Sequence, residues 1–162
     1  MSTRANIIIE SKKDKEKLYF YRHSDGYPEG TLPTLNIFMD WLKKGIIRDN
    51  VQQSAGWLIL IGAIEYNTIP EFDLEKPGWR GAKVDGDINT IKNPTDWKCG
   101  AYEPTNGIHG DIVYLYEINL DDKTLVCKEA EVDYSKDWTD STRQTFKVKP
   151  IDAYLEQVLN NK

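Results

Sequence analysis

The sequence predicts an α+β fold in a single domain, with a mainly antiparallel sheet packed against two or three helices. Three observations support this prediction. Short β-branched and aromatic runs occur near both ends of the chain, two stretches with helical spacing of apolar residues lie between them, and a third helical stretch ends the chain. The 162 residues, 40% of them hydrophobic, suit one domain with its own core.

The first 22 residues predict a β-hairpin. RANIIIE (4–10) and KLYFYR (17–22) are the expected strands, and the charged segment SKKDKE between them is the expected tip. The next segment, 23–33, contains two glycines and two prolines and predicts a loop.

A helix is expected after this loop. Thr31 or Thr34 can cap it, and Gly45 lies near its end. Apolar residues recur through it at helical spacing: Leu35, Phe38, Leu42 and Ile46.

A second helix follows, with Asp49 or Asn50 as its cap. It is almost wholly apolar over 55–64, which predicts the central helix of the core. Ten apolar residues are too few to cross a bilayer, and the N-terminus lacks the pattern of a signal peptide. We therefore expect a cytoplasmic protein that does not enter the membrane.

The segment 67–100 shows no regular pattern, although it contains Trp79 and Trp97. A loop of this length is uncommon in a compact domain and is often functional. Beyond it, three strands and a final helix are expected, the helix with Pro150 at its start: 111–119, 124–132, 145–149 and 151–159.

Charge and motifs restrict the possible functions. The formal net charge of −5 argues against a general nucleic-acid binder, although a local basic pocket for a small anion remains open. Cys99 and Cys127 lie far apart and are expected to be reduced thiols. The chain has no P-loop, dinucleotide-binding, zincin or nucleophile-elbow motif, so no cofactor is predicted and nothing calls for an enzyme.

Two His-x-Asp pairs stand out: His23 with Asp25 in YRHSDGYPEG, and His109 with Asp111 in GIHGDIVYLYEI. In extended chain, residues i and i+2 point the same way, so all four groups meet if their strands are neighbours. They would then suit a zinc, manganese or iron ion, or acid–base chemistry on a phosphoester. The alternative is ordinary turn chemistry of Asp beside Gly.

Arginine and aromatic residues provide further candidates for a binding site. Arg22 beside a glycine-rich loop suits phosphate or carboxylate, and Arg4 on the paired strand can add to one cationic spot. The alternative for Arg22 is an internal pair with an acid: Asp25, Glu29 or Asp111. Aromatic side chains next to arginine can stack on a planar ligand: Tyr27, Tyr102 and Trp79.

Several segments together resemble a family of small, uncharacterised proteins from bacteriophages and prophages: STRANI (2–7), YRHSDGYPEG (21–30), LPTL (32–35) and YEPTNGIHGDIVYLYEI (102–118). The resemblance covers roughly the first 120 residues and brings no settled activity. It implies a viral protein that acts in the cytoplasm of the infected or lysogenic host. Small acidic phage proteins without catalytic motifs are often inhibitors of host defence, and some sequester nucleotide immune signals as oligomers.

The function expected from these features is non-enzymatic binding of a small phosphate-bearing ligand by a homo-oligomer. Arg22 holds the anion and His23 and His109 donate hydrogen bonds, while Asp25 and Asp111 orient the histidines or read ribose hydroxyls. The aromatic residues named above stack on the base. One alternative is a metal-dependent hydrolase that uses the two His-x-Asp pairs. Another is a protein-binding inhibitor of a host factor, with 67–100 as its contact surface.

Overall fold

The computed structural model describes residues 2–67 and 99–154. Its elements in chain order are β1 (Ala5–Ser11), β2 (Glu16–Arg22), α1 (Pro28–Lys43), α2 (Val51–Asn67), β3 (Glu103–Thr105), β4 (Tyr114–Asn119), β5 (Thr124–Val132) and β6 (Gln144–Val148). The strands form one sheet in the order β3-β2-β1-β4-β5-β6, with β1 parallel to β4 and the other neighbours antiparallel. The predicted α+β class with a mainly antiparallel sheet is confirmed.

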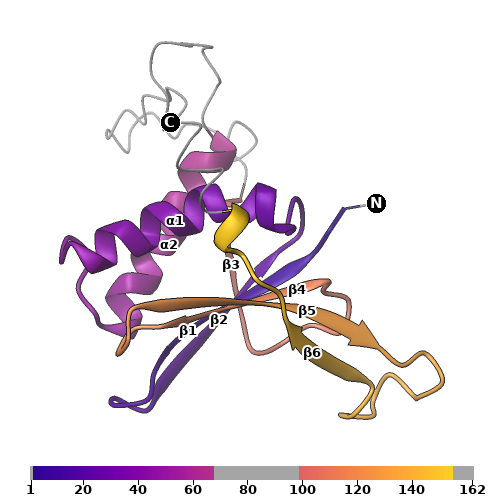
Figure 1. Ribbon diagram of the computed structural model, residues 1–162. Helices are drawn as coiled ribbons and strands as arrows, with labels where there is room; N and C mark the ends of the chain where they lie inside the picture. The colour runs from indigo at the N-terminus through magenta and orange to yellow at the C-terminus, as the bar shows by residue number, and fades with distance from the viewer. Residues whose placement is uncertain (1, 68–98, 155–162) are drawn as a thin grey trace.

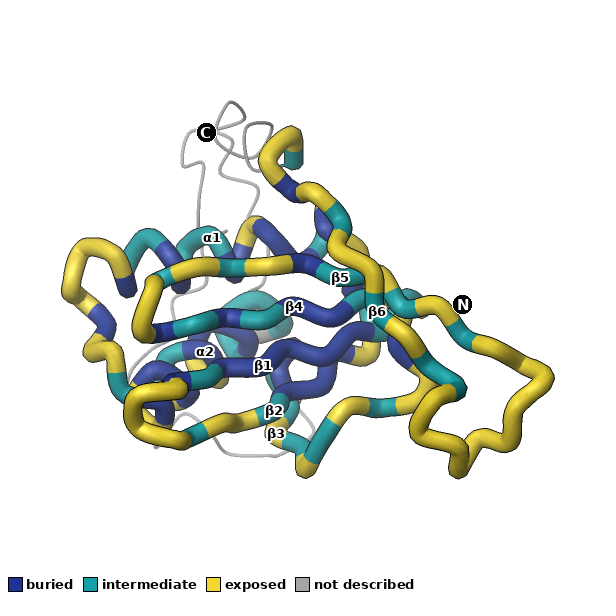
Figure 2. Tube along the Cα trace, turned by 60° about the horizontal axis from the view of Figure 1, so that its bottom comes forward, coloured by how far each residue is buried: buried dark blue, intermediate teal, exposed yellow. Residues whose placement is uncertain are grey.

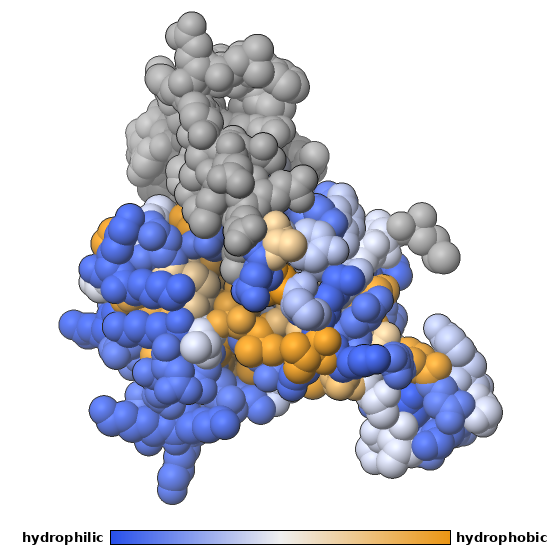
Figure 3. All heavy atoms as spheres, viewed as in Figure 1, coloured by the Kyte–Doolittle hydropathy of each residue, from blue (hydrophilic) through white to orange (hydrophobic). Residues whose placement is uncertain are grey.

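Two layers make up the described part of the protein. Helices α1 and α2 lie on one face of the sheet, and Figure 2 shows the strands from the other face, which we call the open face. Ile7 of β1 lies opposite both Phe20 and Tyr116, and all three are buried against the helices. Hydrophobic side chains reach the surface in a band between the helices and the sheet (Figure 3).

The central strand β1 is buried on both faces. Ile7 and Ile9 belong to the core beneath the helices, whereas Ile8 belongs to a smaller cluster on the open face, with Tyr21, Ile112 and Leu115. A strand that is covered on both faces needs apolar side chains at consecutive positions, which accounts for the Ile-Ile-Ile run. The hairpin prediction is confirmed, since β1 and β2 pair along their whole length.

The first helix begins earlier than predicted. Helix α1 starts at Pro28 with Tyr27 in the cap position, so the prediction of a loop as far as residue 33 was wrong, and so were the threonine caps. Thr31 instead donates its hydroxyl to the carbonyl of Asp25. The cause is Pro28, because proline fixes φ near the helical value and suits the first position, where its missing N–H is not needed.

The turn between the helices also differs from the prediction. Helix α1 ends at Lys43, and Ile46 lies beyond it with 57% of its surface exposed, while Ile47 takes the buried position. Gly45 has a φ of +73°, a left-handed conformation that favours glycine. The capping of α2 by Asn50 is confirmed, because its side chain accepts a 3.0 Å hydrogen bond from the backbone N–H of Gln53.

The second helix buries one side. Leu58 and Ile61 are buried, whereas Ile59 and Leu60 are exposed over 41% and 44% of their surfaces. Part of the apolar run 55–64 therefore lies outside the described core, and the prediction of a central core helix is correct for one side of α2 only. Within the described ranges, no helix is both long and apolar enough to traverse a bilayer.

The C-terminal strands follow the prediction closely. Strand β5 has the predicted bounds, β6 is shifted by one residue, and β4 begins at 114 and not at 111. Strand β3 was not predicted. Residues 152–154 are helical, but the rest of the predicted last helix lies outside the described residues, as do residues 68–98 of the predicted loop.

Gly62 in α2 permits a close contact with the segment before β3. A Cβ atom at this position would lie 2.8 Å from the ring of Tyr102 and 2.9 Å from its backbone nitrogen. The backbone N–H of Ala101 also donates to the carbonyl of Gly62.

We predict that Gly62→Ala lowers the free energy of unfolding by about 1–3 kcal/mol, because the added methyl overpacks the contact. Gly56→Ala in the same helix is the control, since a Cβ there meets nothing within 4 Å. That variant should gain up to about 1 kcal/mol from helix propensity. Urea denaturation measures both, and equal changes in the two variants would contradict the packing argument.

Candidate functional site

The two predicted histidines meet at Tyr21, on the open face of the sheet. The ring of His109 stacks on Tyr21 with centroids 4.0 Å apart, and His23 approaches the same ring edge-on at 4.4 Å. Residues from two distant segments thus form one cluster. The convergence that the sequence left open is present for the histidines.

Strand β3 supplies an oxygen to each imidazole. Tyr21 lies opposite Glu103 in the β2–β3 ladder. Glu103 Oε2 lies 2.5 Å from His23 Nε2, and Thr105 Oγ1 lies 2.7 Å from His109 Nε2. Sequence reasoning missed Glu103 and Thr105 because it did not predict β3, although their i and i+2 spacing fits a strand that presents both to one face.

Asn6 of β1 anchors the second histidine through its backbone. Its side-chain oxygen accepts a 2.7 Å hydrogen bond from the backbone N–H of His109, and its amide donates to the carbonyl of Phe20 at 2.8 Å. Asn6 itself is fully buried. The loop before β4 is therefore fixed to the sheet by a buried amide.

The two aspartates do not join the histidines as a group of ligands. Asp111 accepts a 2.9 Å hydrogen bond from the Tyr21 hydroxyl and lies 3.4 Å from Nε of Arg4. Asp25 has a φ of +56° and accepts a hydrogen bond from Tyr27. Among the described residues, no three His, Cys, Asp or Glu side chains are grouped so that they could hold a metal ion.

Arg22 lies on the other face, beneath the helices, and is 1% exposed. Its guanidinium contacts both carboxylate oxygens of Glu65, at 2.8 and 3.2 Å, and donates to the carbonyls of Ser24 and Gly30. The internal pair therefore forms with Glu65 and not with the acids named from the sequence. The predicted cationic spot shared by Arg4 and Arg22 is wrong, because the two side chains lie on opposite faces.

Tyr102 packs beside Arg22, with the guanidinium 5.2 Å from its ring centre. Its hydroxyl contacts that of Thr34, and its ring is 2% exposed. Burial raises the pKa of Tyr102 to about 12. Of the other predicted stacking residues, Tyr27 is 38% exposed, and Trp79 lies outside the described residues.

A cleft of about 540 Å³ adjoins the histidine cluster at Asp111. Its walls come from the segment before β4, from the end of β5 and from the β5–β6 connection: Asp111, Ile112, Val113, Ala130, Tyr134 and Arg143. Volumes of about 300–1,000 Å³ are usual for small-molecule sites. The connection projects from the body of the molecule in Figures 1 and 3.

Arg143 is the cation of this cleft. Its guanidinium lies 5.6 Å from the ring centre of Tyr134, whose surface is 83% exposed. Nε of Arg143 is buried and has no hydrogen-bond partner in the described part of the chain. The residue as a whole is half-buried, and unlike Arg22 its guanidinium makes no hydrogen bond to the described residues, so its terminal donors are open to a ligand.

Three short turns order the carboxylates of the β5–β6 connection, and one of them, Asp137, also interacts electrostatically with Arg143. Asp133, Asp137 and Asp140 each accept hydrogen bonds from the hydroxyl and the backbone N–H of the residue two positions later. These bonds lower the pKa of all three carboxyl groups. The repeated Asp-x-Ser/Thr spacing in 133–142 is the sequence signal that could have indicated an ordered connection here.

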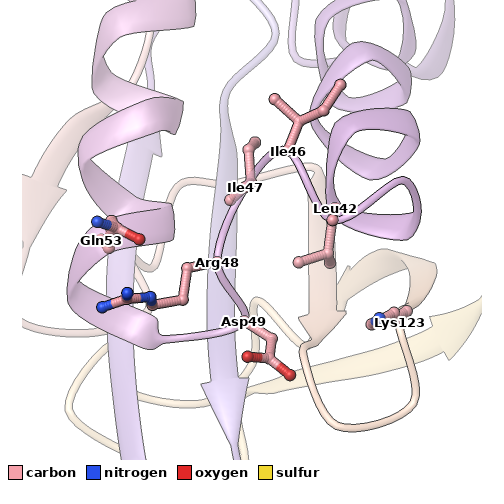
Figure 4. A pocket seen from close by; sticks show the side chains of 8 residues that line it. Leu42, Ile46, Ile47, Arg48, Asp49, Gln53 and Lys123 are labelled. Atoms are coloured by element: carbon pink, nitrogen blue, oxygen red, sulfur yellow. The ribbon is translucent and has the colours of Figure 1, made fainter.

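A second hollow of about 520 Å³ lies at the turn between α1 and α2. In Figure 4, Arg48 and Lys123 lie on opposite sides of it and Asp49 lies between them. It has no aromatic wall and Arg48 is exposed, so this hollow suits a planar ligand less well than the cleft at Arg143.

Comparison with known proteins adds no functional information. No family model matches the chain, and neither a curated protein nor a solved structure matches it. The functional argument therefore rests on the geometry described above.

We predict that Arg22→Ala destabilises the protein by about 3–5 kcal/mol, because it removes the buried guanidinium that binds Glu65 and the carbonyls of Ser24 and Gly30. Urea denaturation measures this loss. Arg4→Ala is the control, because its pair with Asp111 is solvent-exposed and contributes less than about 1 kcal/mol. Similar stability of the two variants would show that Arg22 is not structural.

Alkaline pH tests the environment of Tyr21. Burial, and then the hydrogen bond to Asp111, raise the pKa of Tyr21 to about 12 from an ordinary value of 10. Its protonated form therefore adds stability that is complete below pH 10 and is lost as the pH rises through 12.

Tyr21→Phe retains the ring contacts and removes this titration. We predict a shallower loss of stability between pH 10 and 12 than in the wild type. Denaturation at a series of pH values measures it, with an absorbance titration of the phenols as a second readout. Identical profiles for variant and wild type would refute the prediction.

Proposed function

We propose that the protein is a non-enzymatic binding protein for a small, planar, phosphate-bearing ligand, held in the cleft beside Asp111. The observation that carries the proposal is the pairing of Arg143, a guanidinium with unused donors, with the exposed ring of Tyr134. A guanidinium fits a phosphate in a bidentate manner, and an exposed aromatic ring can stack on a base.

The position of the cleft supports the same proposal. Ile112, Val113 and Ala130 give it an apolar wall, and Asp111 brings one polar group to its edge. Binding sites for small molecules commonly combine apolar walls with a few convergent polar groups. We assign the anion-binding role to Arg143 and not to Arg22, which the sequence favoured, because the guanidinium of Arg22 is paired with Glu65.

The histidines contribute from the neighbouring cluster. His23 and His109 enclose the ring of Tyr21, and the hydroxyl of Tyr21 holds Asp111 at the edge of the cleft. His23 is also exposed and remains a candidate donor to the ligand. In this proposal both histidines support the binding site, and no chemical step is assigned to them.

The resemblance to phage proteins suggests the biological role. Sequestration of a nucleotide immune signal of the host requires binding without turnover. A homo-oligomer remains part of the proposal. The metal-dependent hydrolase gains no support from the described residues, since the two aspartates contact different partners.

We predict that the melting temperature of the wild type rises with at least one member of a panel of cyclic nucleotides, ADP-ribose derivatives and other nucleotides, by mass action. Arg143→Gln should weaken that binding by tenfold or more, because it removes a charge-assisted contact worth about 1.5–3 kcal/mol. Isothermal titration calorimetry measures the affinity.

Arg48→Gln is the matched control, because it removes the same charge from the other hollow. It should bind like the wild type, and the ligand should be recovered unchanged after denaturation of the complex. Equal losses in the two variants would point to net charge and not to the cleft. A hydrolysed ligand would establish an enzyme.

A further inference from the structure

The cleft carries charges of both signs. Arg143 supplies the cation, and Asp111 supplies a carboxylate whose side chain is 52% exposed. Tyr21 and Arg4 already contact this carboxylate, and Arg4 offsets part of its charge. What charge remains disfavours a bare phosphate at the edge of the cleft. A ligand that brings hydrogen-bond donors as well as an anionic group therefore fits the cleft better than phosphate alone.

The two oxygens of Asp111 differ in their environment. Oδ2 accepts the hydrogen bond from Tyr21 and lies next to Arg4, whereas Oδ1 has no hydrogen-bond partner among the described residues. Tyr21 cannot turn away easily, because His109 stacks on its ring and His23 packs against its edge. The carboxylate is thus held in one orientation with an acceptor atom left over.

A fixed carboxylate with a free acceptor suits a pair of neighbouring hydroxyl groups. In dinucleotide-binding folds an acidic side chain recognises ribose hydroxyls in this manner, and the same chemistry applies wherever a carboxylate lies beside a phosphate site. Hydrogen bonds to a charged acceptor contribute more than those between neutral groups. Deoxyribose has one hydroxyl fewer and would leave this acceptor less well satisfied.

We infer that the cleft selects ribonucleotides, with the vicinal hydroxyls of the ribose donating to Asp111, the phosphate on Arg143 and the base against Tyr134. This inference rests on the proposed function and narrows it to a substrate class. Tyr21, His23 and His109 are positioning residues in this scheme, since they act on the ligand through Asp111.

Calorimetric titration with three probes tests the inference: ADP, 2′-deoxy-ADP and inorganic pyrophosphate. The wild type should bind ADP about tenfold or more tightly than 2′-deoxy-ADP. Asp111→Asn should reduce that preference to less than about threefold and should bind pyrophosphate more tightly than the wild type, because the repelling charge is gone.

Asp25→Asn is the matched control. It alters the other His-x-Asp pair, at a position where asparagine tolerates the positive φ, and Asp25 does not line the cleft. It should keep the wild-type preference. Loss of the preference in both variants would overturn the role of Asp111. An Asp111→Asn protein whose affinities for all three probes fall by the same factor would also overturn it.

The failures of the two proposals are distinguishable. Equal binding of ADP and 2′-deoxy-ADP by the wild type overturns the inference of ribose selection and leaves the binding function in place. Absence of binding to all three probes and to the nucleotide panel overturns both. If a Tyr21→Phe protein keeps the wild-type preference for ADP over 2′-deoxy-ADP, the carboxylate of Asp111 needs no positioning by the tyrosine.

Discussion

The pair formed by the buried Arg22 and the half-buried Glu65 is the contact on which the arrangement around the candidate site depends. It joins the end of β2 to α2, and the two carbonyls that Arg22 binds join the same side chain to the segment after β2 and to the start of α1. The buried positive charge of Arg22 is tolerated because its guanidinium is hydrogen-bonded to Glu65 and to two carbonyls and packs beside the ring of Tyr102. Although burial alone would lower its pKa, Tyr102 and Glu65 together raise the pKa of Arg22, so it stays charged.

The orientation of Arg22 also places the histidine cluster. Side chains alternate along a strand, so an Arg22 that points towards the helices sends Tyr21 to the open face. His23 then lies on the same face as Tyr21, and the pairing of β2 with β3 brings Glu103 beside it. A residue that contacts no ligand in our proposal thus fixes the position of those that support the binding site.

Much of the fold could be predicted from local patterns. The alternating and β-branched runs predicted β1, β2 and β5 correctly, because these strands are long and are bounded by residues typical of turns. The start of α1 could not be predicted by counting prolines and glycines, because Pro28 begins a helix where it was taken to prevent one. Strand β3 has three residues, too few to show a period.

The site was harder to predict than the fold, because it depends on partners far away in the chain. Arg22 and Arg143 are the same residue type, and the sequence favoured Arg22 because it lies beside glycines and a histidine. Whether a guanidinium is available for a ligand depends on its acceptors, and the acceptor of Arg22, Glu65, lies 43 residues away in the sequence. The histidines were found because their pattern is repeated, whereas the separation of their aspartates depends on the turns that each segment makes.

An acidic protein that binds an anion must rely on contacts at short range. With a net charge of −5 the chain repels a phosphate at a distance, and salt screens that repulsion beyond about 10 Å. In the described part of the chain the guanidinium of Arg143 forms no close ion pair, although it interacts electrostatically with Asp137. Asp111, whose charge Arg4 partly offsets, disfavours an anion that brings no hydroxyl groups. Specificity is a difference between affinities and often requires an element that disfavours the wrong ligand. Asp111 can supply that element, which gives a physical reason for a carboxylate beside the only arginine that lines this cleft in the described part of the chain.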